Sequence, residues 1–357
     1  MVIRELEGEN GGSPRTIAFA RSELRPLGYA VLLSARLHEP LTIPLRLDNG
    51  TVIESDIEGL DRTQRYSVDT TLESPLTCHA VSLMQGGWLP PSLAATGDDP
   101  TILLDRNLVP LLVGRGRKNE ASAGRDFLDL FKDRPIKLNP LLYAMEGERR
   151  ETPAPDQVAA LLLEAVDKLR TALPNARVVA DPAMLRGALG LIEDARPALG
   201  RKQAFLLQIA PGLAASVGRM RLPAVWADVV SAADHCGVCR NSLVVLAALS
   251  AVAVPNGASP AKALLKFKPG YTEQDAYNAL ADLRALELLM GLYAMFPQER
   301  IHFCTADRAL ALFWTAIQAS NFERRESGFT FDLEPIDALL PGDTLQQWRE
   351  SLRTQPG

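Results

Sequence analysis

The chain has 357 residues, of which 47% are hydrophobic, 23% are charged and 6% are aromatic. That length predicts two domains, or one enlarged domain with an added layer, and it is enough to bury a large core. Lys and Arg number 38 against 43 Asp and Glu, which gives a net charge of −5. This balance excludes an overall positive field, so any binding of nucleic acid would need a local basic patch.

The composition also bears on the compartment. The longest apolar run, Ser242–Val254, is shorter than the roughly 20 residues of a membrane-spanning helix, so we predict a buried core helix and no contact with a membrane. The N-terminus is charged and rich in glycine, unlike a secretion signal. Four cysteines, Cys78, Cys236, Cys239 and Cys304, are too few for a disulfide framework in a chain of this size. We therefore expect a cytoplasmic protein.

Residues 1–95 are predicted to form a β-rich N-terminal domain. Short β-type runs fill this region: TIAFA, YAVLLSARL, LTIPLRL, TVIESDI and RYSVDTTL. The triplet Asp48-Asn49-Gly50 separates two of them, and Asn-Gly provides the positive φ angles of a tight hairpin. Gly86–Pro100 is rich in Gly, Pro and small polar residues, which marks it as the boundary to the next domain.

The pattern then changes to apolar strands separated by helices. Short strands are predicted at Thr101–Leu104 and Ile301–Cys304. Such strands, when joined by helical crossovers, run parallel and have helices on both faces, so residues 96–325 are predicted to form an α/β domain, followed by a C-terminal extension at 326–357. Apolar residues at helical spacing predict helices over about 154–173, 182–195, 197–209, 223–235, 241–254, 273–296 and 309–318.

Two aspartates follow the predicted strands. Asp105 comes directly after TILL, and Asp307 closes the triplet Thr305-Ala306-Asp307 after the second strand. Open α/β sheets bind ligands at the carboxyl ends of their strands, so neighbouring parallel strands would bring both carboxylates to one crevice. Buried like charges in such a position require a cation, which would imply a metal site. The alternative is that each aspartate only caps the helix that follows it.

A third acidic segment lies on the helix predicted before the second strand. Asp275, Asn278 and Asp282 are spaced i, i+3 and i+7, which places them on one face of that helix. Because the helix leads directly into the second strand, this face could be directed at Asp307. The alternative is an ordinary solvent-facing acidic stripe, which is the commoner situation for helical carboxylates.

A fourth acidic candidate is Glu146, which ends an apolar stretch 41 residues beyond Asp105. Glu148 and Glu151 lie close behind it, and physical reasoning alone does not choose among the three. Glu146 is preferred because it directly follows the apolar turn.

Taken together, these segments resemble the PIN-domain family of metal-dependent ribonucleases over about residues 100–320. In that family an apolar strand ends in Asp, a small hydroxyl residue and Asn. A Glu follows one helical hairpin later, an Asp lies on a later helix, and a strand then ends in Thr-x-Asp. Arg106 departs from the pattern, since the family usually has Ser or Thr there. The long interval between the Glu and the later Asp would accommodate a helical insertion at about 155–221. The matching residues are Asp105, Asn107, Glu146, Asp282, Thr305 and Asp307.

The resemblance implies a nuclease that hydrolyses phosphodiester bonds of RNA, or of single-stranded DNA, with Mg²⁺ or Mn²⁺. Hard divalent cations of this kind prefer oxygen ligands, which the four carboxylates would supply. It also implies that Asn107, Asn278 and Thr305 orient the ligands by hydrogen bonding. Basic side chains near the motifs could bind substrate phosphates, although each could also be an ordinary solvated cation. These basic residues are Arg106, Arg115, Arg117, Lys118 and Arg308.

A second reading belongs to another class of function. A non-catalytic scaffold or regulatory protein could keep the same fold and bind a protein partner through its N-terminal domain or helical insertion. Convergence of the four carboxylates on one cation would separate the two readings. A zinc site at Cys236 and Cys239 is disfavoured, because the second ligand pair of a structural zinc site is missing at regular spacing.

Overall fold

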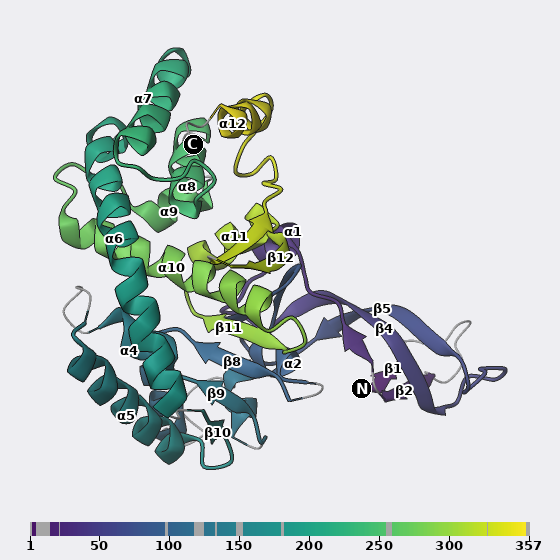
Figure 1. Cartoon of the computed structure of the whole chain (residues 1–357). Helices are drawn as coiled ribbons and strands as arrows, with labels where there is room; N and C mark the ends of the chain where they lie inside the picture. The colour runs from purple at the N-terminus through teal and green to yellow at the C-terminus, as the bar shows by residue number, and fades with distance from the viewer. Residues whose placement is uncertain are drawn as a thin grey trace.

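The protein is described by a computed structural model over residues 2–4, 15–20, 22–96, 99–117, 125–132, 134–147, 153–179, 182–254, 259–326 and 328–354. Within these ranges it is a mixed α/β protein (Figure 1). Its elements in chain order are β1 (Val2–Arg4), β2 (Thr16–Ala20), β3 (Glu23–Leu24), α1 (Tyr29–Ser34), β4 (Thr42–Ser55), β5 (Arg65–Glu73), β6 (Val81–Met84), β7 (Gly87–Leu89), α2 (Pro91–Ala94), β8 (Thr101–Leu104), α3 (Leu108–Arg117), η2 (Phe127–Phe131), β9 (Lys137–Asn139), α4 (Leu141–Glu146), α5 (Pro155–Ala172), β10 (Arg177–Val178), α6 (Pro182–Leu213), η3 (Arg219–Arg221), α7 (Leu222–His235), α8 (Leu243–Ala253), α9 (Pro260–Leu265), α10 (Glu273–Met295), β11 (Ile301–Thr305), α11 (Arg308–Ile317), β12 (Ser320–Arg325), β13 (Gly328–Asp332) and α12 (Thr344–Arg353).

A six-stranded mixed sheet forms the centre of the molecule, in the order β10-β9-β8-β11-β6-β7. The strands β10, β9, β8 and β11 run parallel, and β6 and β7 add an antiparallel edge. The prediction that the strands at 101 and 301 run parallel is therefore confirmed, and the two strands are also neighbours, with Ile301 paired to Thr101 and Cys304 paired to Leu104. Their carboxyl ends open at the same edge of the sheet.

The N-terminal sheet has the order β1-β2-β4-β3, with β5 also paired to β4. In Figure 1 the β4–β5 ribbon extends away from the helices. The sequence predicted a strand over YAVLLSARL and a hairpin at Asn49-Gly50, and both predictions were wrong. Tyr29–Ser34 is the short helix α1, and Thr42–Ser55 is one continuous strand. Asn49 does adopt a positive φ of 58°, but at a point where the β4–β5 register shifts, so its left-handed backbone makes a bulge rather than a turn.

The sheets do not follow the predicted domain boundaries. β6 and β7, which lie inside the predicted N-terminal domain, belong to the central sheet, so sheet membership changes near residue 80 rather than 95. The region predicted as a helical insertion contains the whole of α5 and α6, but also the edge strand β10. The two helices predicted at 182–195 and 197–209 are one helix, α6, which runs through Pro197.

Helices complete the core around the central sheet. Every residue of α8 is buried, as its uniformly apolar sequence predicts. α5 packs on α3 and α4, while α6 packs on α10 and α7. Among the helices that the structure describes, none combines the length and the apolar character needed to cross a bilayer.

Gly87, the first residue of β7, allows this strand to lie close to both β6 and the segment that leads into α1. Its φ is 154°, and a Cβ atom there would lie 2.1 Å from the carbonyl oxygen of Leu27. Trp88 and Leu27 exchange two backbone hydrogen bonds across this contact, at 2.9 and 3.0 Å. Gly87→Ala is therefore expected to lower the free energy of unfolding by about 2–4 kcal/mol, measured by urea denaturation.

Gly114 offers a matched control for this change. It lies inside α3, and no atom lies within 4 Å of the position of an added Cβ. Gly114→Ala should leave stability unchanged or raise it by up to about 1 kcal/mol, because alanine favours helix. Equal effects of the two substitutions would contradict a steric role for Gly87.

Candidate active site

The site begins at the carboxyl ends of β8 and β11. Asp105 directly follows β8 and is only 8% exposed, and its backbone N–H donates to Cys304 O at 3.0 Å across the sheet. The Thr305 hydroxyl, at the end of β11, donates to Asp105 Oδ2 at 2.7 Å. The same hydroxyl oxygen accepts from the Asp307 N–H at 3.0 Å. Thr305 thus links the two aspartates that follow the two strands.

Asp307 does cap the helix after β11. Its Oδ1 accepts from the Leu310 N–H at 3.0 Å, at the first turn of α11. The capping interpretation is therefore correct for this side chain. Capping engages Oδ1, and Asp307 is not among the residues that line the pocket formed by the other three carboxyl groups.

Glu146 ends α4 and is fixed by two long-range contacts. The Tyr277 hydroxyl of α10 donates to the backbone carbonyl of Glu146 at 2.7 Å. Arg106 donates to the carbonyl of Gly147 and to that of Tyr143 at 3.4 Å, and its guanidinium lies 5.1 Å from the centre of the Tyr143 ring. Cations stabilise the carbonyl end of a helix. Arg106 thereby ties the end of β8 to the end of α4.

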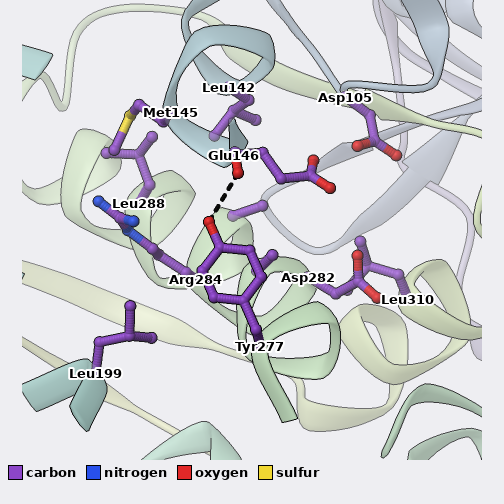
Figure 2. A pocket seen from close by; sticks show the side chains of 12 residues that line it. Asp105, Leu142, Met145, Glu146, Leu199, Tyr277, Asp282, Arg284, Leu288 and Leu310 are labelled. Carbon is purple, nitrogen blue, oxygen red and sulfur yellow. Dashed lines mark hydrogen bonds between the residues drawn. The ribbon is translucent and has the colours of Figure 1, made fainter. Parts of the chain in front are cut away.

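Asp282 comes from the middle of α10 and completes the arrangement. Figure 2 shows the carboxyl groups of Asp105, Glu146 and Asp282 directed at the same space. All three line one pocket, whose other walls come from α4, α6, α10 and α11. The end of β8 and helices α4 and α10 therefore bring together carboxyl groups up to 177 positions apart, counted from Asp105 to Asp282.

Burial and mutual repulsion raise the pKa values of these three carboxyl groups. Burial and the charge of Asp105 raise the pKa of Glu146 to about 7, despite the opposing charge of Arg106. Burial, and then the charges of Asp307, Asp105 and Glu146, raise the pKa of Asp282 well above its usual value. Burial also raises the pKa of Asp105, against the hydrogen bond from Thr305. The pocket therefore favours protons or a cation over bare carboxylates.

The carboxyl groups do not form a ready-made cage for a metal. Within the ranges that the structure describes, no three His, Cys, Asp or Glu side chains are grouped closely enough to hold an ion. Like charges without a cation spread apart, and Glu and Asp side chains have rotatable bonds that change the position of their oxygens. Coordination would require Glu146 and Asp282 to rotate toward Asp105.

Other predicted site residues have different surroundings. Asn107 is exposed at the start of α3, and Asn278 is half-buried on α10. Asp275 belongs to the capping box of α10 and pairs with Lys268 at 2.7 Å, so it is not part of the pocket lining. The acidic stripe proposed on α10 is divided, with Asp275 in a cap and Asp282 in the pocket.

The predicted phosphate-binding side chains are mostly engaged in structural contacts. Arg308 donates to the carbonyls of Leu32 and Leu33 near the end of α1, at 3.0 and 2.8 Å. Arg106 binds the end of α4, as described above. Lys118 and the side chain of Arg117 lie outside the described residues.

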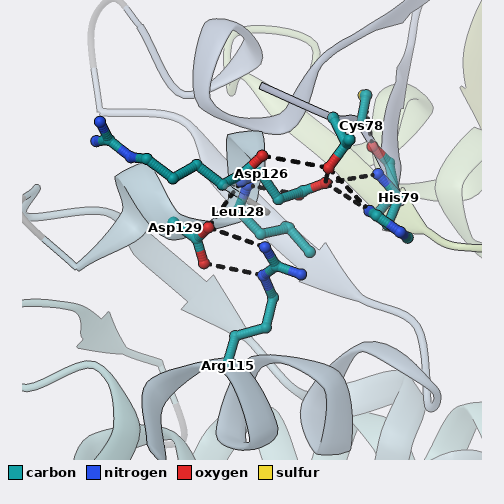
Figure 3. Close-up of polar contacts among 9 residues, drawn as sticks. Cys78, His79, Arg115, Asp126, Leu128 and Asp129 are labelled. Carbon is teal, nitrogen blue, oxygen red and sulfur yellow. Dashed lines mark hydrogen bonds and ion pairs between the residues drawn. The ribbon is translucent and has the colours of Figure 1, made fainter. Parts of the chain in front are cut away.

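Arg115 belongs to a partly buried network that the sequence did not indicate (Figure 3). Its guanidinium binds both carboxyl oxygens of Asp129 at 2.9 Å. Asp129 in turn accepts from the N–H of Asp126, which is fully buried. Asp126 Oδ2 accepts from the Thr77 hydroxyl at 2.8 Å and contacts His79 Nδ1 at 2.8 Å, so the network joins the segment before β6 to η2.

This arrangement predicts a structural role for Arg115. Arg115→Met is expected to lower the free energy of unfolding by about 1–3 kcal/mol, because it leaves the Asp129 carboxylate without its bidentate partner. Binding of labelled single-stranded RNA, measured by fluorescence anisotropy, should be unchanged in the folded variant. A variant of unchanged stability with weakened RNA binding would instead assign Arg115 to the substrate.

Sequence reasoning missed two polar residues of the pocket lining, Tyr277 and Arg284. Both lie on α10, seven positions apart and thus on one face of the helix. The other residues of that face are mostly apolar, so its sequence did not indicate a functional site. Burial lowers the pKa of the Arg284 guanidinium. A charged residue among the apolar positions of the helix predicted at 273–296 is the signal that could have found it.

Comparison with known proteins adds no relative. No protein-family model, curated protein sequence or solved structure matches the chain. Its function must therefore be argued from the residues and their geometry.

Proposed function

We propose that the chain is a metal-dependent nuclease of the PIN type, which hydrolyses phosphodiester bonds of RNA or of single-stranded DNA. The observation that carries the proposal is the set of three carboxyl groups directed at one space beside the ends of β8 and β11 (Figure 2). Their raised pKa values indicate a place where positive charge is needed. The oxygen donors fit the preference of Mg²⁺ and Mn²⁺.

In this proposal Asp105, Glu146 and Asp282 would hold the cation, with Asp307 as a fourth ligand. A cation bound there would activate water and neutralise charge on the reacting phosphate. The chain's own residues prepare the site. Thr305 fixes the rotamer of the Asp105 carboxylate through its 2.7 Å hydrogen bond.

Glu146 is positioned through its backbone rather than through its side chain. Arg106 and Tyr277 bind carbonyls at the end of α4, which leaves the Glu146 carboxyl group able to turn toward Asp105. The apolar walls from α4, α6 and α10 restrict water around the carboxyl groups. These features support a site whose residues are brought together by the fold and whose carboxyl groups would turn toward one another when a cation binds.

The test is incubation of the purified protein with labelled single-stranded RNA and single-stranded DNA in Mn²⁺ or Mg²⁺. We expect cleavage that stops when a chelator is added and that is lost in the double variant Asp105→Asn/Asp307→Asn. Cleavage that persists in chelator, or in the double variant, would contradict the proposal.

One observation favours a second candidate function. Because the carboxyl groups are not grouped as a finished metal site, the chain could be a scaffold or regulatory protein that binds a protein partner through its N-terminal sheet or its helical region. Titration calorimetry with Mn²⁺ separates the two proposals. Metal binding that is lost in Asp105→Asn supports the nuclease, whereas no metal binding by the folded wild-type protein supports the scaffold.

A further inference from the structure

Arg284 is the one cation among the side chains that line the pocket, within the part of the chain that the structure describes. It lies two residues beyond Asp282 on α10. In Figure 2 its guanidinium is directed away from the carboxyl groups, toward the opposite part of the pocket. The neighbouring walls there are apolar and include Leu199 of α6 and Leu288 of α10. The pocket thus has an acidic end and a basic end.

The guanidinium of Arg284 is incompletely satisfied. Its Nη2 atom is buried and has no hydrogen-bond partner among the described residues. The next acidic residue toward the end of the helix, Glu287, is already bound by Lys202 Nζ, at 2.6 and 2.7 Å to its two carboxyl oxygens. A buried donor without a partner costs free energy, and in a native pocket it calls for a specific explanation.

An anionic ligand group would remove this cost. Guanidinium groups bind phosphate through charge-assisted hydrogen bonds of fixed geometry, which are stronger than bonds between neutral groups. Because Nη2 is buried at the end of a narrow pocket beside Leu199 and Leu288, the group that binds it is better supplied by the end of a molecule than by a point within a continuous strand. A phosphate monoester is such an end, and it carries more charge than a phosphodiester.

We propose that Arg284 binds a terminal phosphate monoester of the substrate strand, while the carboxyl groups at the other end of the pocket act on a neighbouring phosphodiester. This inference rests on the proposed nuclease function for the identity of the strand. It makes the enzyme selective for strand ends that bear a phosphate, at either the 5′ or the 3′ terminus.

The test uses short single-stranded RNAs with a 5′-phosphate, a 3′-phosphate or hydroxyls at both ends, each labelled at the end that does not vary. Binding is measured by fluorescence anisotropy in Ca²⁺ and again in chelator. We expect the wild-type protein to bind one of the two phosphorylated strands at least about tenfold more tightly than the dihydroxyl strand, as one charged hydrogen bond predicts. The preferred strand identifies the terminus.

Arg284→Met should abolish this preference and Arg284→Lys should keep part of it, because lysine retains the charge but not the forked geometry. Arg284→Met replaces a half-buried cation that has one unsatisfied donor by an apolar side chain, so it should fold with unchanged or higher stability. Arg349→Met, at an exposed position of α12, is the matched control and should keep the full preference. Equal binding of all three strands, or a preference that survives Arg284→Met, would overturn the inference.

Cleavage measured in parallel separates this inference from the proposed function. If the phosphate preference depends on Arg284 but no strand is cleaved in Mn²⁺, the phosphate site stands and the nuclease proposal fails. If strands are cleaved in Mn²⁺ with no effect of the terminal phosphate or of Arg284, the nuclease stands and the phosphate site fails.

Discussion

Asp282→Asn is expected to reduce Mn²⁺-dependent cleavage by about a thousandfold or more, which corresponds to about 4 kcal/mol of lost transition-state stabilisation. The amide keeps the shape of the side chain but removes the charge that would bind the cation. The same change should raise stability at neutral pH, because Asp105, Glu146 and Asp307 all repel a charge at position 282. Initial rates and urea denaturation of the same preparations test both halves of this expectation.

Asp275 provides a matched control on the same helix. Its carboxylate accepts from the Thr272 hydroxyl at 2.8 Å and pairs with Lys268, and these contacts lower the pKa of Asp275 to about 2. Asp275→Asn should therefore lower stability slightly, as weakening of a helix cap does, and leave cleavage unchanged. Loss of activity in both variants, or in neither, would contradict a specific role of Asp282 in the reaction.

The opposite roles of these two carboxylates mark how far sequence reasoning reaches. Their spacing places them on one helix and almost on one face. It does not reveal that Asp275, in the first turn of α10, pairs with Lys268, whereas Asp282, in the third turn, lines the pocket beside the ends of β8 and α4. By contrast, Asp105 and Thr305 were found readily, because four-residue apolar strands followed by polar residues indicate parallel strands whose ends meet.

The missed features depend on contacts between distant segments. Arg106 stands where a small hydroxyl residue was expected, and its partners at Tyr143 and Gly147 lie 37 and 41 residues away. The apolar content of residues 29–34 predicted a strand. In the structure this segment is the short helix α1, which packs against α11 and buries only Leu32. The local hairpin of β12 and β13 was missed for another reason: its strands have only six and five residues, and the alternation of Phe329 and Phe331 in β13 is too short to indicate a strand by itself.

The metal-free protein should lose stability as the pH rises from about 5 to about 8. The pKa of Glu146 is raised from 4.5 to about 7 in the folded state, so the folded protein binds the proton more tightly than the unfolded chain does. The stabilisation from that proton is complete below about pH 4.5 and is lost as the pH passes through about 7, which amounts to on the order of 3 kcal/mol. The raised pKa values of Asp105 and Asp282 act in the same direction.

His302 acts in the opposite direction over part of this range. Burial lowers the pKa of this strand residue to about 4, so its contribution to stability is lost as the pH falls below about 6.5. The informative quantity is therefore the difference between the wild-type protein and Glu146→Gln, measured by urea denaturation in chelator at each pH. We expect Glu146→Gln to be more stable than the wild type by about 2–3 kcal/mol near pH 8 and nearly equal to it near pH 5.

Mn²⁺ should restore the stability that the wild-type protein loses at high pH, and it should have no such effect on Glu146→Gln. A cation that binds the folded state stabilises it by mass action, and it replaces the protons that the carboxyl groups release at high pH. Glu299→Gln, at an exposed position after α10, is the control and should follow the wild type in both conditions. If the wild type and Glu146→Gln show the same pH dependence and the same response to Mn²⁺, the carboxyl groups do not share one pocket in solution, and neither the raised pKa values nor the metal-binding proposal can stand.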